Sequence, residues 1–289
     1  MSEYHTPVLL KESVSALAIK PGGVYVDATF GGGGHSKAIL EQLSAKGRLI
    51  AIDQDSDALA NAPQDKRLIP VRSNFRFVHN WIRYHGFDVV DGILADLGVS
   101  SHQFDTEERG FSFRFDSELD MRMSDAAAKS AKEVVNGYSE EALEKILREY
   151  GEVANSRFAA KLICEARSVR PITTTAELNA ALEKATPAFG QHKYLAKVYQ
   201  ALRIEVNDEM TALERFMPMA VKSLAEGGIL AVITYHSLED RIVKNAIRDG
   251  YLEKVTSKPI LPAESEIEGN TRARSAKLRV AKRTAMGHR

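Results

Sequence analysis

The first hundred residues alternate short apolar runs with segments whose apolar residues recur every three or four positions. The apolar runs cover residues 23–27, 48–53, 68–72 and 89–96. Runs of this length and composition are typical of strands buried on both faces. The periodic segments, which predict helices, cover residues 35–43, 55–62 and 78–84. This alternation predicts a parallel sheet with helices on both faces, and Pro70 places the third run at an edge or a bend.

The next clear strand covers residues 228–235, about 130 residues after the fourth. A crossover between neighbouring parallel strands needs only a dozen or more residues, and a compact domain does not hold such a stretch as bare loop. The gap therefore predicts a helical domain inserted into the sheet domain. We expect the sheet domain to occupy 1–105 and 207–289, and the insert to occupy 106–206.

The insert and the C-terminal region contain local sequence patterns that predict further helices and one strand. Ser139 is placed to cap a helix with two glutamates in its first turn, and 174–177 fits a capping box. Further helices are predicted at 158–166, 198–206 and 208–224, the last ending at Gly227 and Gly228. Beyond them, we expect a loop over 254–270 and a half-exposed strand over 276–282, where apolar and basic residues alternate.

The amino-acid composition restricts the classes of function that the chain can have. Of 289 residues, 44% are hydrophobic and 27% charged, as in globular proteins. Lys plus Arg and Asp plus Glu both total 39, so nucleic-acid affinity has to come from local basic patches. The single Cys164 excludes a disulfide framework and a cysteine-based zinc site, and we expect no metal. No apolar run approaches about 18 residues and the start lacks signal-peptide features, which predicts a cytoplasmic protein without a membrane partner.

A run of four glycines, 31–34, lies between the first strand and the first helix. Such a turn lets a ligand approach the backbone and the helix N-terminus. A dinucleotide motif would need glycine at Ser36, and Lys37 follows that serine instead of preceding a Ser or Thr as in a P-loop. The remaining pattern, with Asp27 four residues before the glycines, suits an adenosyl amino acid. A glycine turn without a ligand is the alternative.

Acidic residues end two further strands. Asp53 follows Gly31 by 22 positions, a spacing suited to a carboxylate that accepts hydrogen bonds from ribose hydroxyls. A capping role is the alternative, for which Asp55 is better placed. Asp96 ends the fourth strand, where it can contact the cofactor or a substrate amine, or simply satisfy a turn. Phe75 is placed either to stack on adenine or to pack in the core.

Seven motifs together resemble one family. They are YHTPVLL at 4–10, DATFGGGGHS at 27–36, DLGVSS at 96–101, ERGFS at 108–112, LDMRM at 119–123, YHSLEDRIVK at 235–244 and ARSAKLR at 273–279. This set resembles the RsmH (MraW) family across nearly the whole chain. The resemblance implies a Rossmann-like class I S-adenosylmethionine methyltransferase domain with an inserted helical domain. It also implies N4-methylation of a cytidine in the decoding region of small-subunit (16S) ribosomal RNA.

The resemblance also implies roles for individual residues. Carried over by motif, the cofactor contacts are Gly33, Gly34, His35, Asp53, Phe75, Asp96 and Gln103. The acceptor side involves Ser100, Arg109 and His236. The chain departs from the family at Gly32, at His102 where Pro is common, and in a short 254–270 stretch, which puts the shape of that loop in doubt.

Two residues are candidates for the chemistry. The exocyclic amine of cytosine is a poor nucleophile, so an acceptor on its N–H should strengthen it as positive charge develops. Asp96, or a carbonyl of Leu97 or Gly98, is placed for this. His236, past the fifth strand, can take the released proton or bond the base, and a structural histidine is the alternative. Cys164 lies on an apolar stripe of the insert, which argues against ring-carbon methylation.

Basic residues in two regions are candidate RNA contacts, each with a solvated face as its alternative. They are Arg157, Lys161, Arg167 and Arg170 in the insert, and Arg272, Arg274, Lys277 and Arg279 near the C-terminus. The expected partner is small-subunit ribosomal RNA or the assembled small subunit. Rival functions are an amine methyltransferase acting on another nucleic acid or a small molecule, and a non-catalytic ribosome-binding module. The sequence leaves the oligomeric state open, a homodimer included.

Overall fold

A computed structural model describes residues 7–98, 109–124, 127–249 and 251–285. The chain forms two compact units. The sheet unit comprises residues 1–101 and 210–289, and the helical unit comprises residues 102–209.

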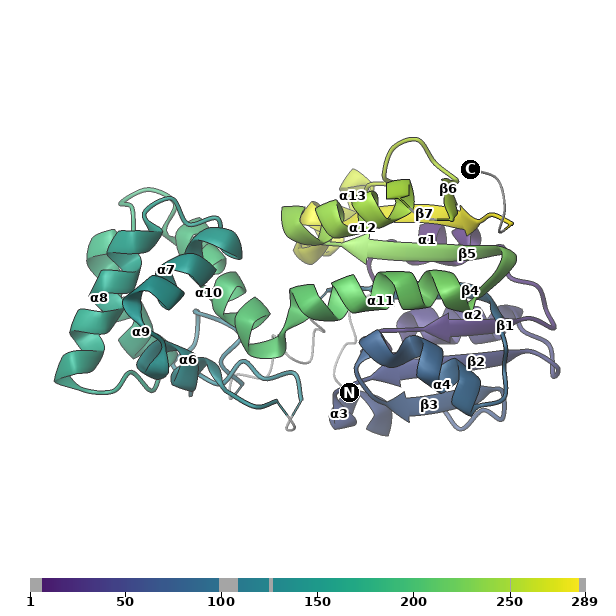
Figure 1. Ribbon diagram of the computed structural model, residues 1–289, viewed down its shortest axis with the longest axis horizontal. Helices are drawn as coiled ribbons and strands as arrows, with labels where there is room; N and C mark the ends of the chain where they lie inside the picture. Colours follow the sequence, from purple (N-terminus) through teal and green to yellow (C-terminus); the bar gives the residue numbers. More distant parts are fainter. Residues whose placement is uncertain (1–6, 99–108, 125–126, 250, 286–289) are drawn as a thin grey trace. The chain divides into compact units, whose positions relative to one another are not determined.

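A seven-stranded sheet forms the centre of the sheet unit (Figure 1). Its strands are β1 (Val24–Asp27), β2 (Arg48–Asp53), β3 (Leu68–Arg72), β4 (Val90–Asp96), β5 (Leu224–Thr234), β6 (Leu252–Lys254) and β7 (Lys277–Arg283). The order is β3-β2-β1-β4-β5-β7-β6, with β1 to β5 parallel and β7 antiparallel to both of its neighbours. The predicted Rossmann-like α/β class is confirmed. Pro70 lies in the edge strand β3, where its missing N–H leaves no gap in the ladder.

Successive strand residues point to opposite faces, and this alternation divides the core into two layers. The helices are α1 (Leu10–Ala16), α2 (Gly34–Gln42), α3 (Ser56–Ala60), α4 (Val78–Tyr84), α11 (Glu209–Ser223), α12 (Ser237–Asp249) and α13 (Glu264–Gly269). On one face, Val26 and Ile93 share a buried cluster with Phe216 of α11. On the other face, Tyr25 and Leu94 pack with Ile39 of α2, so both faces of the sheet are covered.

The structure corrects two predictions about the C-terminal half. The helix predicted to end at Gly227 and Gly228 ends at Ser223, and both glycines lie within β5. The pairing of β4 with β5 shifts register between Val90 and Gly92, and Gly227 has φ +77°. These glycines therefore accommodate an irregularity in the strand instead of a helix end. The loop predicted over 254–270 contains α13, a six-residue helix too short to show a helical repeat.

The helical unit consists of short helices around its own core. They are α6 (Ala131–Gly137), α7 (Glu140–Glu149), α8 (Ser156–Val169), α9 (Thr175–Ala181) and α10 (Gln191–Asn207). Ser139 caps α7 by accepting a hydrogen bond from the Ala142 amide, as predicted. Thr174 and Glu177 form the predicted capping box of α9. None of the helices in the described ranges has both the length and the apolar content to cross a membrane.

Candidate active site at the carboxyl ends of the strands

Parallel pairing brings the carboxyl ends of β1, β2, β4 and β5 to one edge of the sheet. Asp27, Asp53 and Asp96 are the last residues of their strands, and Tyr235 directly follows β5. The register pairs Asp27 with Ala51 and Leu94, and Asp96 with Ile233. Ligands of open α/β sheets bind outside this edge, so three predicted acidic residues lie where a ligand is expected.

The glycine turn joins β1 to α2 and leaves no room for side chains at two positions. Gly33 has φ +75° and caps α2, and a Cβ built there would lie 2.8 Å from the ring of Phe30. A Cβ on Gly34 would lie 2.1 Å from Cγ of Pro7. Both contacts are shorter than real Cβ atoms tolerate. The turn therefore requires glycine for its own packing, and it exposes backbone that a ligand can approach.

Asp27 fastens this turn to the sheet. Its carboxylate is buried and accepts hydrogen bonds from the Ser36 hydroxyl (2.7 Å) and the Thr29 amide (3.2 Å). Burial raises the pKa of Asp27, although the nearby His35 opposes the shift. Asp27 thus stabilises the glycine turn through these two hydrogen bonds, a role that the sequence did not reveal.

His35 lies in the first turn of α2 and is buried. One ring nitrogen, Nε2, is 3.2 Å from the carbonyl oxygen of Val8. The other, Nδ1, is 4.0 Å from Oδ2 of Asp96. The imidazole therefore lies between the segment before α1 and the end of β4.

Among the residues that the structure describes, Asp53 is held by backbone amides alone. Oδ2 accepts from the Gly31 amide (2.7 Å) and Oδ1 from the Asp55 amide (2.9 Å). Burial raises the pKa of Asp53 to about 6, and the two amides oppose that shift. Asp55 caps α3 by accepting from the Asp57 amide, so Asp53 is not the capping residue. Each oxygen of Asp53 has one such bond, which leaves acceptor capacity for ligand hydroxyls.

Asp96 is held mainly by the side chain of Tyr235, the residue that follows β5. Its Oδ1 accepts from the Tyr235 hydroxyl (2.8 Å) and from the Gly98 amide (3.2 Å). Its own amide donates to the Thr29 hydroxyl (2.7 Å), and its side chain is 20% exposed. Burial raises the pKa of Asp96, while His35 and the Tyr235 hydrogen bond lower it. The carboxylate is thus fixed in orientation through Oδ1.

Tyr235 was not identified from the sequence. Burial raises the pKa of Tyr235 well above its usual value, so the phenol stays protonated. Its hydroxyl therefore donates a hydrogen bond to Asp96. A Cβ built on Gly98 would lie 2.8 Å from the Tyr235 ring. Gly98 therefore leaves the space through which the phenol reaches Asp96, a relation between residues far apart in the sequence.

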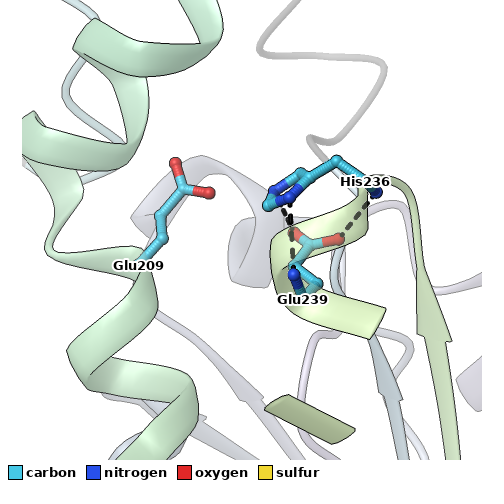
Figure 2. A group of neighbouring side chains, drawn as sticks. All are labelled: Glu209, His236 and Glu239. Atoms are coloured by element: carbon cyan, nitrogen blue, oxygen red, sulfur yellow. Dashed lines mark hydrogen bonds and ion pairs between the residues drawn. The ribbon is translucent and has the colours of Figure 1, made fainter. Parts of the chain in front are cut away.

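His236 lies in the turn between β5 and α12 and is paired with Glu239 (Figure 2). Its Nε2 is 2.9 Å from Oε1 of Glu239, and the two side chains are 9% and 3% exposed. The other carboxylate oxygen accepts from the amides of Tyr235 (2.7 Å) and His236 (3.4 Å). The Glu239 amide also donates a long hydrogen bond (3.5 Å) to Nδ1, so Glu239 contacts both ring nitrogens of the imidazole. Glu239 is a second residue that sequence reasoning missed.

The remaining predicted cofactor residues divide into two groups. Phe75 follows β3 and is half-buried, with its ring edge-on to Phe216 at a centroid distance of 5.2 Å. One side of Phe75 therefore packs in the core, as one of the two interpretations expected. Gln103, also predicted to contact the cofactor, lies outside the described residues, as does Ser100, which was predicted on the acceptor side.

The predicted RNA contacts differ in how far they are already engaged. Arg109 donates to the Arg122 carbonyl (2.9 Å), and Arg167 donates to the Val135 carbonyl (2.6 Å), so both support the helical unit. Arg157 and Arg274 are exposed. Several others pair with acidic residues: Arg170 with Glu177, Lys161 with Glu165, and Arg279 and Lys277 with Asp240.

The residues at this edge fit an adenosyl amino acid. The ribose hydroxyls and the ammonium group of such a ligand are donors, and Asp53 and Asp96 are acceptors. A ligand carboxylate can meet the amides at the start of α2, where the dipole favours negative charge. The tight glycine turn supplies the close backbone approach that an adenosyl ligand needs. Fold and site together therefore define a Rossmann-like methyltransferase domain.

Comparison with known proteins specifies the family. A model of the MraW methylase family matches residues 2–284. A Flavobacterium johnsoniae protein named ribosomal RNA small subunit methyltransferase H is 52% identical over 97% of this chain and 98% of its own. A Bacteroides fragilis protein of the same name is 53% identical over 97% of each chain. A solved rRNA methylase from Streptococcus thermophilus has a TM-score of 0.43 and 12% identity, with 95% of each chain covered.

The chain belongs to the MraW methylase family. It is a methyltransferase, and its methyl donor is S-adenosylmethionine.

Proposed function

We propose that this methyltransferase methylates N4 of a cytidine in the decoding region of small-subunit (16S) ribosomal RNA. Relatives more than 50% identical over nearly the whole chain are named ribosomal RNA small subunit methyltransferases, which supports the RNA class. The observation that carries the chemistry is Asp96, whose carboxylate is fixed through Oδ1 at the edge that holds the glycine turn. A ribosomal substrate also supports a cytoplasmic location.

The cofactor would be held along β1, β2 and β4. Asp53 would accept hydrogen bonds from the ribose hydroxyls, and Gly33, Gly34 and His35 would line the amino-acid end. Phe75 would contact the adenine with the part of its ring that does not pack against Phe216, and Gln103 would complete the site. Bound there, the sulfonium supplies an activated methyl group, and the protein supplies orientation and electrostatics.

Asp96 would act on the amine of the acceptor. Cytosine delocalises the lone pair of N4 into its ring, so the nitrogen is a weak nucleophile. A carboxylate oxygen that accepts an N–H bond from N4 favours a pyramidal nitrogen, and this bond strengthens as positive charge develops. Since Oδ1 is bonded to Tyr235 and Gly98, Oδ2 is the oxygen that this role requires.

His236 would accept the proton that leaves N4 at Nδ1, where the proton would replace the long hydrogen bond (3.5 Å) from the Glu239 amide. Glu239, 2.9 Å from Nε2, would stabilise the imidazolium as it forms and hold the ring in one orientation. Glu239 is therefore a positioning residue in this proposal, while Asp96 and His236 are catalytic.

Substrate recognition would involve residues 106–206 and the C-terminal strand. The target base has to leave any stack to reach the pocket, and single-stranded RNA is recognised through backbone charge and exposed bases. Arg157 and Arg274, both exposed, are the candidates best able to meet phosphates. Ser100, Arg109 and Arg167 are also proposed on the acceptor side, although Arg109 and Arg167 already hold carbonyl groups.

Transfer of labelled methyl groups tests the proposal. Purified enzyme is incubated with small ribosomal subunits, free ribosomal RNA, DNA and free nucleosides, and the products are digested and analysed by mass spectrometry. We expect N4-methylcytidine from ribosomal RNA, free or in the particle. Methylation of DNA or nucleosides alone would favour the rival amine methyltransferase, and no transfer to any acceptor would favour a non-catalytic ribosome-binding module.

A further inference from the structure

A hollow on the outer side of β7 brings three lysines that the site described above does not use next to Arg279. Its basic lining comes from Lys244 of α12, Lys254 at the end of β6, Lys258 of the following loop, and Arg279 of β7. Ile247 and Val280 contribute apolar lining. We call these six residues the lysine hollow. Figure 1 shows α12, β6 and β7, the elements that carry it, in the sheet unit.

The loop of the lysine hollow is fixed against β7. The Val255 amide donates to the Val280 carbonyl (3.0 Å), and Ile260 exchanges two backbone hydrogen bonds of 2.9 Å with Leu278. Between these anchors, the Thr256 hydroxyl donates to the Lys258 carbonyl (2.8 Å). Lys254 and Lys258 therefore extend from a backbone that is held on both sides.

Among the described residues, Arg279 is the one cation of the lysine hollow with a close carboxylate partner. Asp240 accepts two hydrogen bonds from Arg279, at 2.7 and 3.0 Å, and lies 3.9 Å from Lys277. Within the described parts of the chain, Lys244, Lys254 and Lys258 have no carboxylate within 4.0 Å. Lys244 interacts with Asp240 only over a longer distance. Grouped cations of this kind create a local positive potential that favours an anionic ligand.

The position of the lysine hollow suggests which anion it binds. Arg279 pairs with Val232, and Lys277 pairs with Thr234 at the active edge of β5. In the sheet, β4, β5, β7 and β6 are successive neighbours, so β6, on the outer side of β7, lies three strand spacings, or roughly 15 Å, from β4. A polyanion whose reacting group lies at Asp96 can reach the hollow with a few further residues of its backbone.

We propose that the lysine hollow binds backbone phosphates of the RNA segment next to the target cytidine. This inference rests on the proposed function, because it takes RNA as the substrate. The phosphates would lie among the three lysines, with Arg279 kept in place by Asp240. The hollow thus adds affinity and register without reading the base sequence.

The test replaces two lysines with uncharged residues of similar size. The variant Lys254→Gln/Lys258→Gln is compared with Lys46→Gln/Lys66→Gln, which removes the same charge from exposed lysines before β2 and β3, at the opposite edge. A labelled single-stranded RNA containing the target segment is titrated with each protein by fluorescence anisotropy at several salt concentrations. Calorimetry with S-adenosylmethionine shows whether the cofactor site is intact.

We expect the hollow variant to bind this RNA about tenfold more weakly, with a salt slope smaller by about 1.4, since each phosphate contact on a single strand contributes about 0.7. The control pair and cofactor affinity should stay at wild-type values. An RNA affinity and slope equal to wild type would overturn the proposal.

The methyl-transfer assay distinguishes this proposal from the proposed function. If the wild-type enzyme methylates no ribosomal RNA, the proposed function fails, whatever the salt slopes are. If it does methylate ribosomal RNA and the slopes of the variant and the wild type coincide, only the proposal for the lysine hollow fails.

Discussion

The two halves of the active edge hold their carboxylates in different ways. In the half formed by β1 and β2, the hydrogen bonds of Asp53 within the described part of the chain come from two backbone amides, one in the glycine turn and one in its own turn. In the half formed by β4 and β5, Asp96 depends on the hydroxyl of Tyr235, and His236 depends on Glu239. We infer that the half with Asp53 is preformed for binding the cofactor, because backbone amides fix its carboxylate. In the other half, neighbouring side chains orient the two reactive groups, Asp96 and His236.

The largest effect is expected from Asp96→Asn, which keeps the shape of the side chain and removes the charge. If Asp96 activates the amine, single-turnover rates should fall by roughly 10² to 10⁴. Quenched-flow measurement at saturating cofactor isolates the chemical step, and Asp88→Asn, on a side chain 85% exposed, serves as the matched control. A wild-type rate in Asp96→Asn would remove this residue from the mechanism, and the half formed by β4 and β5 would then lack its proposed activating group.

The next effect concerns the phenol that holds Asp96. In Tyr235→Phe, Asp96 loses a hydrogen bond that lowers its pKa, so that pKa should rise. The acid limb of the rate profile should move to higher pH, because the acceptor has to be ionised. A hydrogen bond to a charged group contributes about 1.5–3 kcal/mol, which corresponds to a rate loss of about 10- to 100-fold at neutral pH.

Gly98→Ala tests the same contact without touching the hydroxyl. The added methyl would lie 2.8 Å from the Tyr235 ring and displace it. We expect Gly98→Ala and Tyr235→Phe to have similar effects that do not add in the double variant, because both break one interaction. Additive losses would show that Gly98 acts independently of Tyr235.

These two halves also differ in what the sequence could predict. The glycine turn, Asp53 and Asp96 could be placed because each directly ends or follows a strand whose apolar pattern is clear. The contact between Tyr235 and Asp96 spans 139 residues, so no local pattern reveals it. Glu239 lies four residues after Tyr235, yet its role depends on the turn into α12. The glycines at 227 and 228 were misassigned because a strand irregularity and a helix end leave the same local signal.

A smaller effect is expected on cofactor binding as the pH falls. The pKa of Asp53 is raised to about 6. Above this pH the carboxylate is ionised and can accept from both ribose hydroxyls, while below it the protonated form loses acceptor capacity. Affinity should therefore be constant above about pH 7 and weaken by up to tenfold for each unit well below pH 6. Calorimetry between pH 5 and 8 measures this, and the weaker binding of Asp53→Asn should lack that pH dependence.

The smallest effect is expected from Ser36→Ala, which removes a hydrogen bond to Asp27 beneath the glycine turn. Because this bond holds the turn and touches no reacting group, its loss should reduce stability by about 1–3 kcal/mol and change cofactor affinity only a few-fold. Urea unfolding and calorimetry measure the two quantities, and Ser168→Ala on the exposed side of α8 is the control. A large loss of turnover with unchanged stability would mean that the binding half is not preformed, because its brace would then act on the reaction itself.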